Sequence, residues 1–374
     1  NIYIIYMVLN YNSNKNWEIN AGKIIGYNNV LEVSANTVLN GSLNGNDASF
    51  NTLDISGALL SSTTITVQSS DISYNITQLG SDIMGDNVSD RFGHTVSISS
   101  DGTIISAGSL YANSNTGYVK VYNYTDGSWV QMGQTLHGLE TGDGQGVTTL
   151  SSNGLIVATS AYNNDTAGSN RGLVRIFQYT DNSWIQMGGN IYGDDNNDYF
   201  SPSLAISYDG TILAVGAYYS NGNRGEVNVY NYNDTSWVKM GLTVLSGNAA
   251  YDWVGRDVAL SSDGLTIAIG SRIYTINQVY SELGLVQIFK YINSSWQQIG
   301  QDIYGEAIST MFGNNVSLSS DGTILAAGGN AVHGGQTGHV KIYKYIDSSW
   351  VQLGGNIYGR YNQNFGWKVS LSSD

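Results

Sequence analysis

Residues 312–359 read FGNNVSLSSDGTILAAGGNAVHGGQTGHVKIYKYIDSSWVQLGGNIYG, and this stretch decides the fold because related copies of it occur earlier in the chain. Its Ser-Trp segment recurs 53 to 59 residues apart, with the tryptophan at positions 129, 184, 237, 296 and 350. An Asp-Gly or Asn-Gly pair keeps step with it, beginning at residues 101, 153, 209, 263 and 321. Two markers that stay in register through five copies indicate a repeat architecture, in which each unit packs mainly on its neighbours.

Each copy contains four segments that we expect to be strands, which in the first copy are residues 95–99, 103–108, 118–124 and the segment beginning at Trp129. The Asp-Gly pair predicts a two-residue type I′ hairpin between the first two strands. The small and apolar second segment suits a strand covered on both faces, whereas the alternation in the third predicts one wetter face. A four-stranded antiparallel sheet repeated about every 50 residues is typical of a β-propeller blade.

We therefore predict an all-β fold, a β-propeller over residues 74–374 with five full blades and a partial sixth. Residues 74–85 resemble a fourth strand without its blade, and we expect such a strand to help close the ring. The repeat breaks off inside its motif at Asp374, which suggests that the natural protein continues. Residues 1–73 lack the repeat and form a predicted β-rich leader, either a fibre-like stalk that trimerises or an irregular segment packed on the propeller.

The composition narrows the classes of function. Charged residues make up only 12% of the chain, the net charge is −14, and there is no cysteine. An acidic chain is a poor ligand for nucleic acid or an anionic membrane, because both are bound through basic faces. The apolar opening, residues 1–9, is too short to span a bilayer. Without cysteine there are no disulfides and no thiolate sites.

A family resemblance rests on two features of the repeat. They are the small residues that end strand two and the Phe-Gly pairs that open strand one, such as Phe312-Gly313 and Phe365-Gly366. The chain resembles the FG-GAP repeats of integrin-α-type β-propellers, and more closely the repeat arrays of marine bacterial, algal and large-virus proteins. The second copy departs from the pattern with Gly144-Gln145. The resemblance implies about seven blades and extracellular recognition. It does not bring calcium with it, because a two-residue turn cannot wrap an ion that needs six or more oxygens.

Antiparallel order places the loops after strands two and four on one face, and these loops are the longer and more variable ones. Variable loops on a rigid scaffold are where binding usually occurs. The candidate ligand-binding residues on this face are Asp194, Asp195, Asp198, Tyr199, Tyr218, Tyr219 and Tyr162. A solvated turn is the alternative for the aspartates, and blade packing is the alternative for the tyrosines. We identify no catalytic residue, metal site or cofactor motif.

These observations favour a non-enzymatic recognition or adhesion module, extracellular or displayed on a cell or virion surface, that binds a protein or glycan through the long-loop face. One alternative is a purely structural head or spacer of a surface or virion fibre. Another is a glycoside hydrolase or lyase on a propeller scaffold, since carboxylate pairs formed across blades are invisible to sequence. We expect no nucleic-acid partner and no insertion into a membrane.

Overall fold

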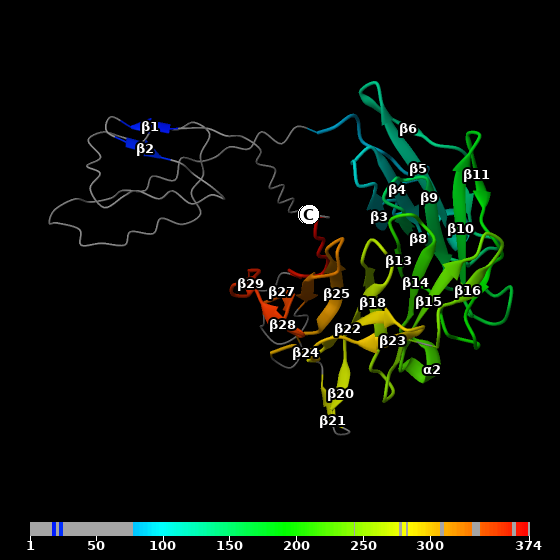
Figure 1. Cartoon of the computed structure of the whole chain (residues 1–374). Coiled ribbons are helices and arrows are strands. Elements are labelled where there is room, and N and C mark those ends of the chain that lie inside the picture. The colour runs from blue at the N-terminus through cyan, green and yellow to red at the C-terminus, as the bar shows by residue number, and fades with distance from the viewer. Residues whose placement is uncertain are drawn as a thin grey trace. The chain divides into compact units, whose positions relative to one another are not determined.

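The computed structural model describes strands β1 (Trp17–Ile19) and β2 (Gly22–Ile24), which pair with each other, and residues 78–372 except 243, 277–278, 282, 307–309, 331–336 and 361–363. The chain divides into two compact units, Asn1–Thr77 and Gln78–Asp374. The second unit contains the repeats (Figure 1). The leader predicted over residues 1–73, with its stalk and trimer, lies outside the described residues apart from β1 and β2.

The second unit is a β-propeller of four-stranded antiparallel blades, which confirms the predicted fold class. Within each blade the strands lie side by side in sequence order, so that every connection joins neighbours. The five blades are β3 (Thr95–Ile98), β4 (Ile104–Ser109), β5 (Tyr118–Thr125), β6 (Ser128–Gln131); β8 (Gln145–Leu150), β9 (Ile156–Ala161), β10 (Leu173–Thr180), β11 (Ser183–Gln186); β13 (Ser203–Ile206), β14 (Ile212–Ala217), β15 (Glu226–Tyr232), β16 (Trp237–Lys239); β18 (Val254–Leu260), β19 (Thr266–Ser271), β22 (Leu285–Ile292), β23 (Ser295–Gln298); and β25 (Phe312–Leu318), β26 (Ile324–Gly329), β27 (His339–Ile346), β28 (Ser349–Gln352).

A short strand that the sequence did not predict follows strand four in each blade and pairs with the start of strand three. These strands are β7 (Leu136–His137), β12 (Ile191–Tyr192), β17 (Leu245–Ser246), β24 (Ile303–Tyr304) and β29 (Ile357–Tyr358). The loops after strand two hold the other elements, which are α1 (Ala112–Asn115), α2 (Ser220–Asn223) and the hairpin of β20 (Tyr274–Ile276) and β21 (Val279–Ser281). No helix among the described residues is long and apolar enough to cross a membrane.

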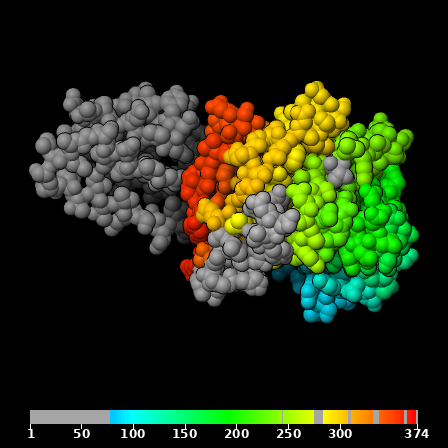
Figure 2. All heavy atoms as spheres, turned by 90° about the horizontal axis from the view of Figure 1, so that it is seen from below, coloured from blue at the N-terminus to red at the C-terminus, as the bar shows by residue number. Residues whose placement is uncertain are grey.

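Neighbouring blades touch through glycine, and Figure 2 shows the blades as adjoining bands of colour. A Cβ placed on Gly270, near the end of β19, would lie 2.0 Å from the carbonyl oxygen of Gly313 in the next blade. The same approach joins Gly108 to Gly146, Gly216 to Gly255 and Gly328 to Gly366. The small residues of strand two and the glycine of the Phe-Gly pair are therefore the two sides of one contact between blades.

This contact corrects the alignment of the second copy. Parallel bridges pair Gly117 with Gln145 and Gly284 with Phe312, so Gln145 occupies the phenylalanine position and Gly146 the glycine position. The Phe-Gly equivalent is thus Gln145-Gly146, and the Gly144-Gln145 assignment was wrong by one residue. The shift follows from the glycine contact, because Gly146 is the residue that meets Gly108.

The turn between strands one and two is longer than the predicted two-residue hairpin. In the first blade, Ser99 N donates to Ile104 O and Gly102 N donates to Ser99 O, so residues 100–103 form a four-residue turn in which Gly102 has a φ of 74°. Asp101 Oδ1 accepts from Ser99 Oγ at 2.6 Å and from Thr103 N at 3.0 Å. These side-chain bonds hold the aspartate in a type I turn, and only the glycine needs the left-handed region.

The same turns also link the blades to one another. Ser100 N donates to Ser152 O at 2.8 Å, Ser152 N donates to Tyr208 O at 3.2 Å, and the series continues through Ser262 to Ser320. The second residue of each turn motif therefore binds the next blade. Short turns linked by hydrogen bonds form this face of the propeller.

We expect the turn aspartates to make stability depend on acid pH. The Ser319 hydroxyl and the Thr323 amide lower the pKa of Asp321, so its contribution is complete above the ordinary aspartate pKa of about 3.9 and is lost as the pH falls through the lowered value. Asn153 makes the equivalent bonds in the second blade, which shows that asparagine fits the turn. Urea unfolding of the wild type and Asp321→Asn between pH 7 and pH 2 should show a difference that disappears in acid; a difference independent of pH would contradict this.

The repeated tryptophan joins its blade to the preceding one. The indole Nε1 of Trp184 donates to Met132 O at 2.7 Å, and that of Trp350 donates to Ile299 O at 3.1 Å. Trp129, in the first blade, donates at 2.8 Å to Leu79 O. Leu79 therefore takes the place that the end of strand four takes elsewhere. Residues 78–85 form no strand in the structure, and residues 74–77 of the predicted leading strand lie outside the described residues.

The alternation in strand three predicted that one face would be exposed to solvent. The first half of the strand is instead buried or half-buried on both faces. The side chains of Lys120, Arg175 and Lys341, at the third position of the strand, belong to residues that are only 8%, 8% and 3% exposed. Lys341 Nζ lies 2.7 Å from Glu306 Oε1, and Arg175 donates to Gln145 Oε1. Polar partners on the neighbouring loops and strands allow these cations to be buried between blades.

Candidate functional site

The candidate residues lie on the face predicted for them. Tyr199 lies in the loop that leads from the second blade into β13, and Tyr218 and Tyr219 follow β14 directly. Because strands one and two are antiparallel, the start of β13 and the end of β14 are adjacent, with Ser203 opposite Gly216. The fold therefore brings the two loops together at one end of the third blade.

The loop after β14 contains α2, a turn with an unusual backbone. Asn221, Gly222 and Asn223 have φ values of 53°, 71° and 67°, so three successive residues are left-handed. Asparagine and glycine are the residues that tolerate this region best. The carbonyl oxygen of Asn223 accepts from Tyr251 N at 2.9 Å and from Trp253 N at 3.4 Å, so the turn also positions the loop that enters the fourth blade.

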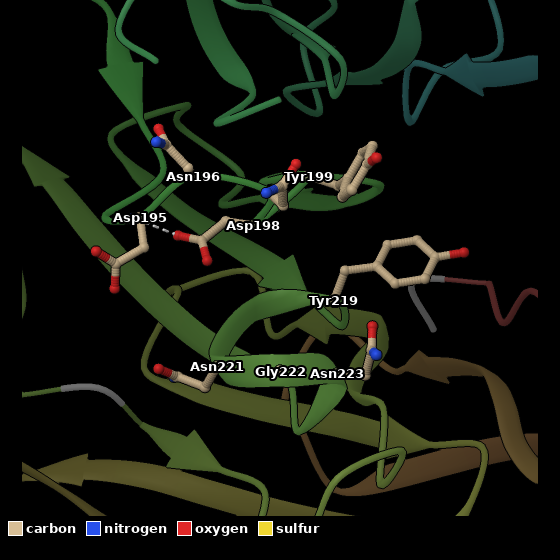
Figure 3. Close-up of a pocket in the computed structure, with 9 residues that line it drawn as sticks. Asp195, Asn196, Asp198, Tyr199, Tyr219, Asn221, Gly222 and Asn223 are labelled. Carbon is tan, nitrogen blue, oxygen red and sulfur yellow. Dashed lines mark hydrogen bonds between the residues drawn. The ribbon is translucent and has the colours of Figure 1, made fainter. Parts of the chain in front are cut away.

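A pocket of about 370 Å³ lies between this turn and the loop before β13 (Figure 3). Two tyrosine rings, Tyr199 and Tyr219, and a set of carboxylate and amide side chains line it. The polar lining is Asp195, Asn196, Asn197, Asp198, Asn221 and Asn223. The pocket thus combines apolar faces with groups that donate and accept hydrogen bonds.

Asp198 serves the loop more than the pocket. It is only 4% exposed, and its Oδ2 accepts from Asp195 N at 2.7 Å. Burial raises the pKa of its carboxyl group. Buried aspartates recur at this position and bond loop amides in the same way; they are Asp90, Asp143 and Asp252. The spacing of five residues after a glycine was the sequence signal for this role, and the sequence interpretation missed it.

The other two aspartates are exposed. Asp194 Oδ2 pairs with Lys239 Nζ at 2.8 Å, and Asp195 is the exposed carboxylate in the pocket wall. The described residues contain no group of three or more histidine, aspartate or glutamate side chains placed to hold a metal ion.

An aromatic cluster extends from the pocket. The ring centroids of Tyr199 and Tyr219 lie 5.3 Å apart, and those of Tyr218 and Tyr219 lie 4.3 Å apart. Trp253 joins the cluster at 6.1 Å from Tyr218. Burial raises the pKa of the fourth candidate tyrosine, Tyr162, and the hydroxyls of Tyr111 and Tyr219 add to the shift. The ring contacts therefore bring three of the candidate tyrosines to one place and add Trp253.

Trp253 was missed because its sequence context lacks the Phe-Gly pair. It occupies the same position as Tyr199, because Trp253 precedes Val254 and Tyr199 precedes the equivalent Phe200, and both have a positive φ, 52° and 45°. Such a φ is unfavourable for a bulky residue and costs on the order of 1–2 kcal/mol. Gly144 takes this position in the second blade, so the fold accepts glycine there. Arg91 and Met311 hold the equivalent position in the first and fifth blades with φ values of 51° and 48°, so the positive φ is a feature of the repeat that the aromatic rings share.

Two arginines stack on the cluster, and sequence reasoning missed both. The guanidinium of Arg256 lies 4.9 Å from the centre of the Tyr218 ring, and that of Arg272 lies 5.3 Å from the centre of the Trp253 ring. Burial raises the pKa of the Tyr218 hydroxyl, and the charge of Arg256 opposes the shift. The aromatic faces are therefore flanked by cations on one side and by the polar pocket on the other.

No protein-family model matches the chain, and no curated protein matches it in sequence. The chain is similar to TolB from Acinetobacter baumannii, with 14% identity, a TM-score of 0.43 and 73% of this chain matched to 55% of that one. It spans little more than half of that protein.

Two further solved structures are similar. One is a putative 6-phosphogluconolactonase from Bacteroides uniformis, with 15% identity, a TM-score of 0.47 and 71% of each chain covered. The other is the β-propeller domain of the trilobed protease from Pyrococcus furiosus, with 11% identity, a TM-score of 0.41, and 69% of this chain matched to 70% of that one. We draw nothing about function from likenesses of this size.

Proposed function

We propose that the chain is a non-enzymatic recognition module, extracellular or displayed on a surface, that binds a glycan in the pocket beside α2. The observation that carries this proposal is the pairing of Tyr199 and Tyr219 with a lining of asparagine and aspartate side chains. Aromatic faces stack on the apolar faces of sugar rings, and amides and carboxylates bond vicinal hydroxyls. The FG-GAP-like repeat supports the same reading, because such propellers serve extracellular recognition.

The carboxylates of the pocket support binding better than hydrolysis. A glycosidase needs two carboxyl groups on either side of the scissile bond, one acid and one base or nucleophile. Asp198 is committed to a loop amide and Asp194 to Lys239, which leaves Asp195. A protein ligand and a purely structural role are the alternatives, and the experiment below separates both of them from glycan binding.

A glycan array first identifies an oligosaccharide that binds the wild type. Calorimetry then compares the affinity of the wild type and of Tyr219→Ala for that oligosaccharide. We expect the variant to bind about tenfold more weakly, since one stacked ring contributes on the order of 1 kcal/mol. Tyr208→Ala is the matched control, because Tyr208 is exposed in the turn between strands one and two on the opposite face. It should bind as the wild type does.

Three results would count against the proposal. Absence of binding to any glycan would favour a protein ligand or a spacer. Unchanged affinity in Tyr219→Ala would move the site elsewhere. Shortened oligosaccharides, detected by mass spectrometry after incubation with the protein, would favour a hydrolase or lyase.

A further inference from the structure

Three cations lie where first strands begin, and one of them, Arg256, stacks on the aromatic cluster. The chain has 15 lysines and arginines and a net charge of −14, yet Arg91, Arg256 and Lys368 all lie in this region. We call these three residues the axial cation group. Burial lowers the pKa of His94, and the charges of Arg91 and Lys368 lower it further. Lys368 Nζ also lies 3.9 Å from Asp257 Oδ1, beside Arg256.

Arg256 connects this group to the pocket. It lies at an irregularity of β18, where the pairing register with β19 shifts between Val254 and Asp257, and its guanidinium covers the Tyr218 ring. Its Nε donates to Asn314 Oδ1 at 3.3 Å. Among the described residues, no carboxylate lies within ion-pair distance of its guanidinium.

The nearest acid in sequence, Asp257, has its oxygens engaged elsewhere. Its Oδ2 accepts from Asn315 Nδ2 and from Val316 N, and its Oδ1 accepts from Ser203 Oγ at 3.0 Å. Asp257 therefore ties three blades together and leaves the Arg256 guanidinium without a carboxylate. A planar guanidinium with unused donors is well suited to a carboxylate or sulfate.

Two further donors beside the cluster are without a partner. Trp253 Nε1 and Ser220 Oγ are buried and make no hydrogen bond within the described structure. Buried polar groups are nearly always hydrogen-bonded, so an unpaired one calls for an explanation such as a missing ligand. Ser220 follows Tyr219 at the start of α2, and the Trp253 ring contacts Tyr218, so both donors belong to residues beside the aromatic cluster.

We infer that the glycan bound by this chain is acidic, and that its carboxylate or sulfate group is received by Arg256 and the axial cation group while the neutral part of the sugar occupies the pocket. This inference rests on the proposed function. Tyr218 and Tyr219, with centroids 4.3 Å apart, form the continuous surface between the two subsites. The acidic pocket wall around Asp195 disfavours an anion there, which sets the direction of the ligand.

The test compares three tetrasaccharides by calorimetry on the full chain: oligogalacturonate, its methyl ester, and a sulfated galactose oligomer. The acid should bind about tenfold or more tightly than the ester, because a charge-assisted hydrogen bond is lost on esterification. The affinity of the acid should fall as the salt concentration rises from 50 to 300 mM, while the affinity of the ester stays constant. The ratio of the carboxylated to the sulfated sugar identifies which anion the site prefers.

Arg256→Gln should abolish the preference for acid over ester, measured as the ratio of the two affinities. Lys368→Gln, at a side chain that is 74% exposed, should reduce both the preference and the salt dependence without affecting folding. Lys344→Gln is the matched control, because Lys344 is exposed in the second half of β27, opposite Ile324 at the start of β26. Equal binding of acid and ester, or a preference that survives in both variants, would overturn the inference and leave the proposed function intact. Failure of all three sugars to bind would count against both.

Discussion

Gly270→Ala should destabilise the propeller by about 3 kcal/mol or more, the upper range for inserting a methyl group into a packed interface. The new Cβ would lie 2.0 Å from Gly313 O and 3.0 Å from Gly313 C. These are backbone atoms, so no side-chain rotation relieves the clash. Gly313 itself has a φ of 81° and cannot easily rearrange. The fourth and fifth blades would have to separate, and we expect a large drop in the urea midpoint.

Gly189→Ala is the control for this substitution. Gly189 has a negative φ and no atom within 4 Å of its added Cβ, so the change should alter stability by about 0.5 kcal/mol or less. If both variants unfolded at the wild-type midpoint, the close approach of glycines would not be what spaces the blades. Serine at the equivalent position of the second blade does not weaken the expectation, because Ser160 meets Ser201 O with its hydroxyl at hydrogen-bond distance, 2.6 Å.

The repeat predicted the blades because each marker reports a contact that every blade must make. Glycine is needed near the end of strand two and in the Phe-Gly pair because these two positions touch between neighbouring blades. This contact becomes visible only when the blades are placed side by side. The pattern predicts that Ser99 ends strand one, whereas Ser99 follows β3 and its hydroxyl donates to Asp101 Oδ1. Local propensity finds a strand and a turn, but it does not find a hydrogen bond between them.

The candidate site was harder to predict because its residues come from different blades. Tyr218 and Tyr219 are neighbours in sequence and were found together. Trp253 and Arg256 come from the next blade and meet them only through the curvature of the array. Asp198 was chosen for its charge, whereas its burial shows that the loop uses it. A position-by-position comparison of the copies around Tyr199, extended one residue before the Phe-Gly pair, would have found Trp253.

Trp184→Ala should have the second large effect, a loss of about 3–5 kcal/mol, as expected for a buried tryptophan. The Trp184 residue is 2% exposed and packs on Tyr179 with centroids 5.0 Å apart. Its indole bonds Met132 O, and its backbone exchanges two hydrogen bonds with the Gln134 side chain. The substitution would empty a site between the first and second blades and leave a carbonyl oxygen without its donor.

Trp129→Ala provides a graded comparison at the same position of the first blade. Trp129 is partly exposed, although it keeps the indole bond to the preceding segment at Leu79 O. Because less of the ring is removed from water, we expect less than half the loss found for Trp184→Ala. Trp184→Phe separates the two contributions, since it keeps most of the ring and removes the N–H donor, at a cost of about 1–3 kcal/mol. Urea unfolding followed by circular dichroism measures all three. Equal losses at positions 129 and 184 would show that the indole bond, and not burial between blades, accounts for the repeated tryptophan.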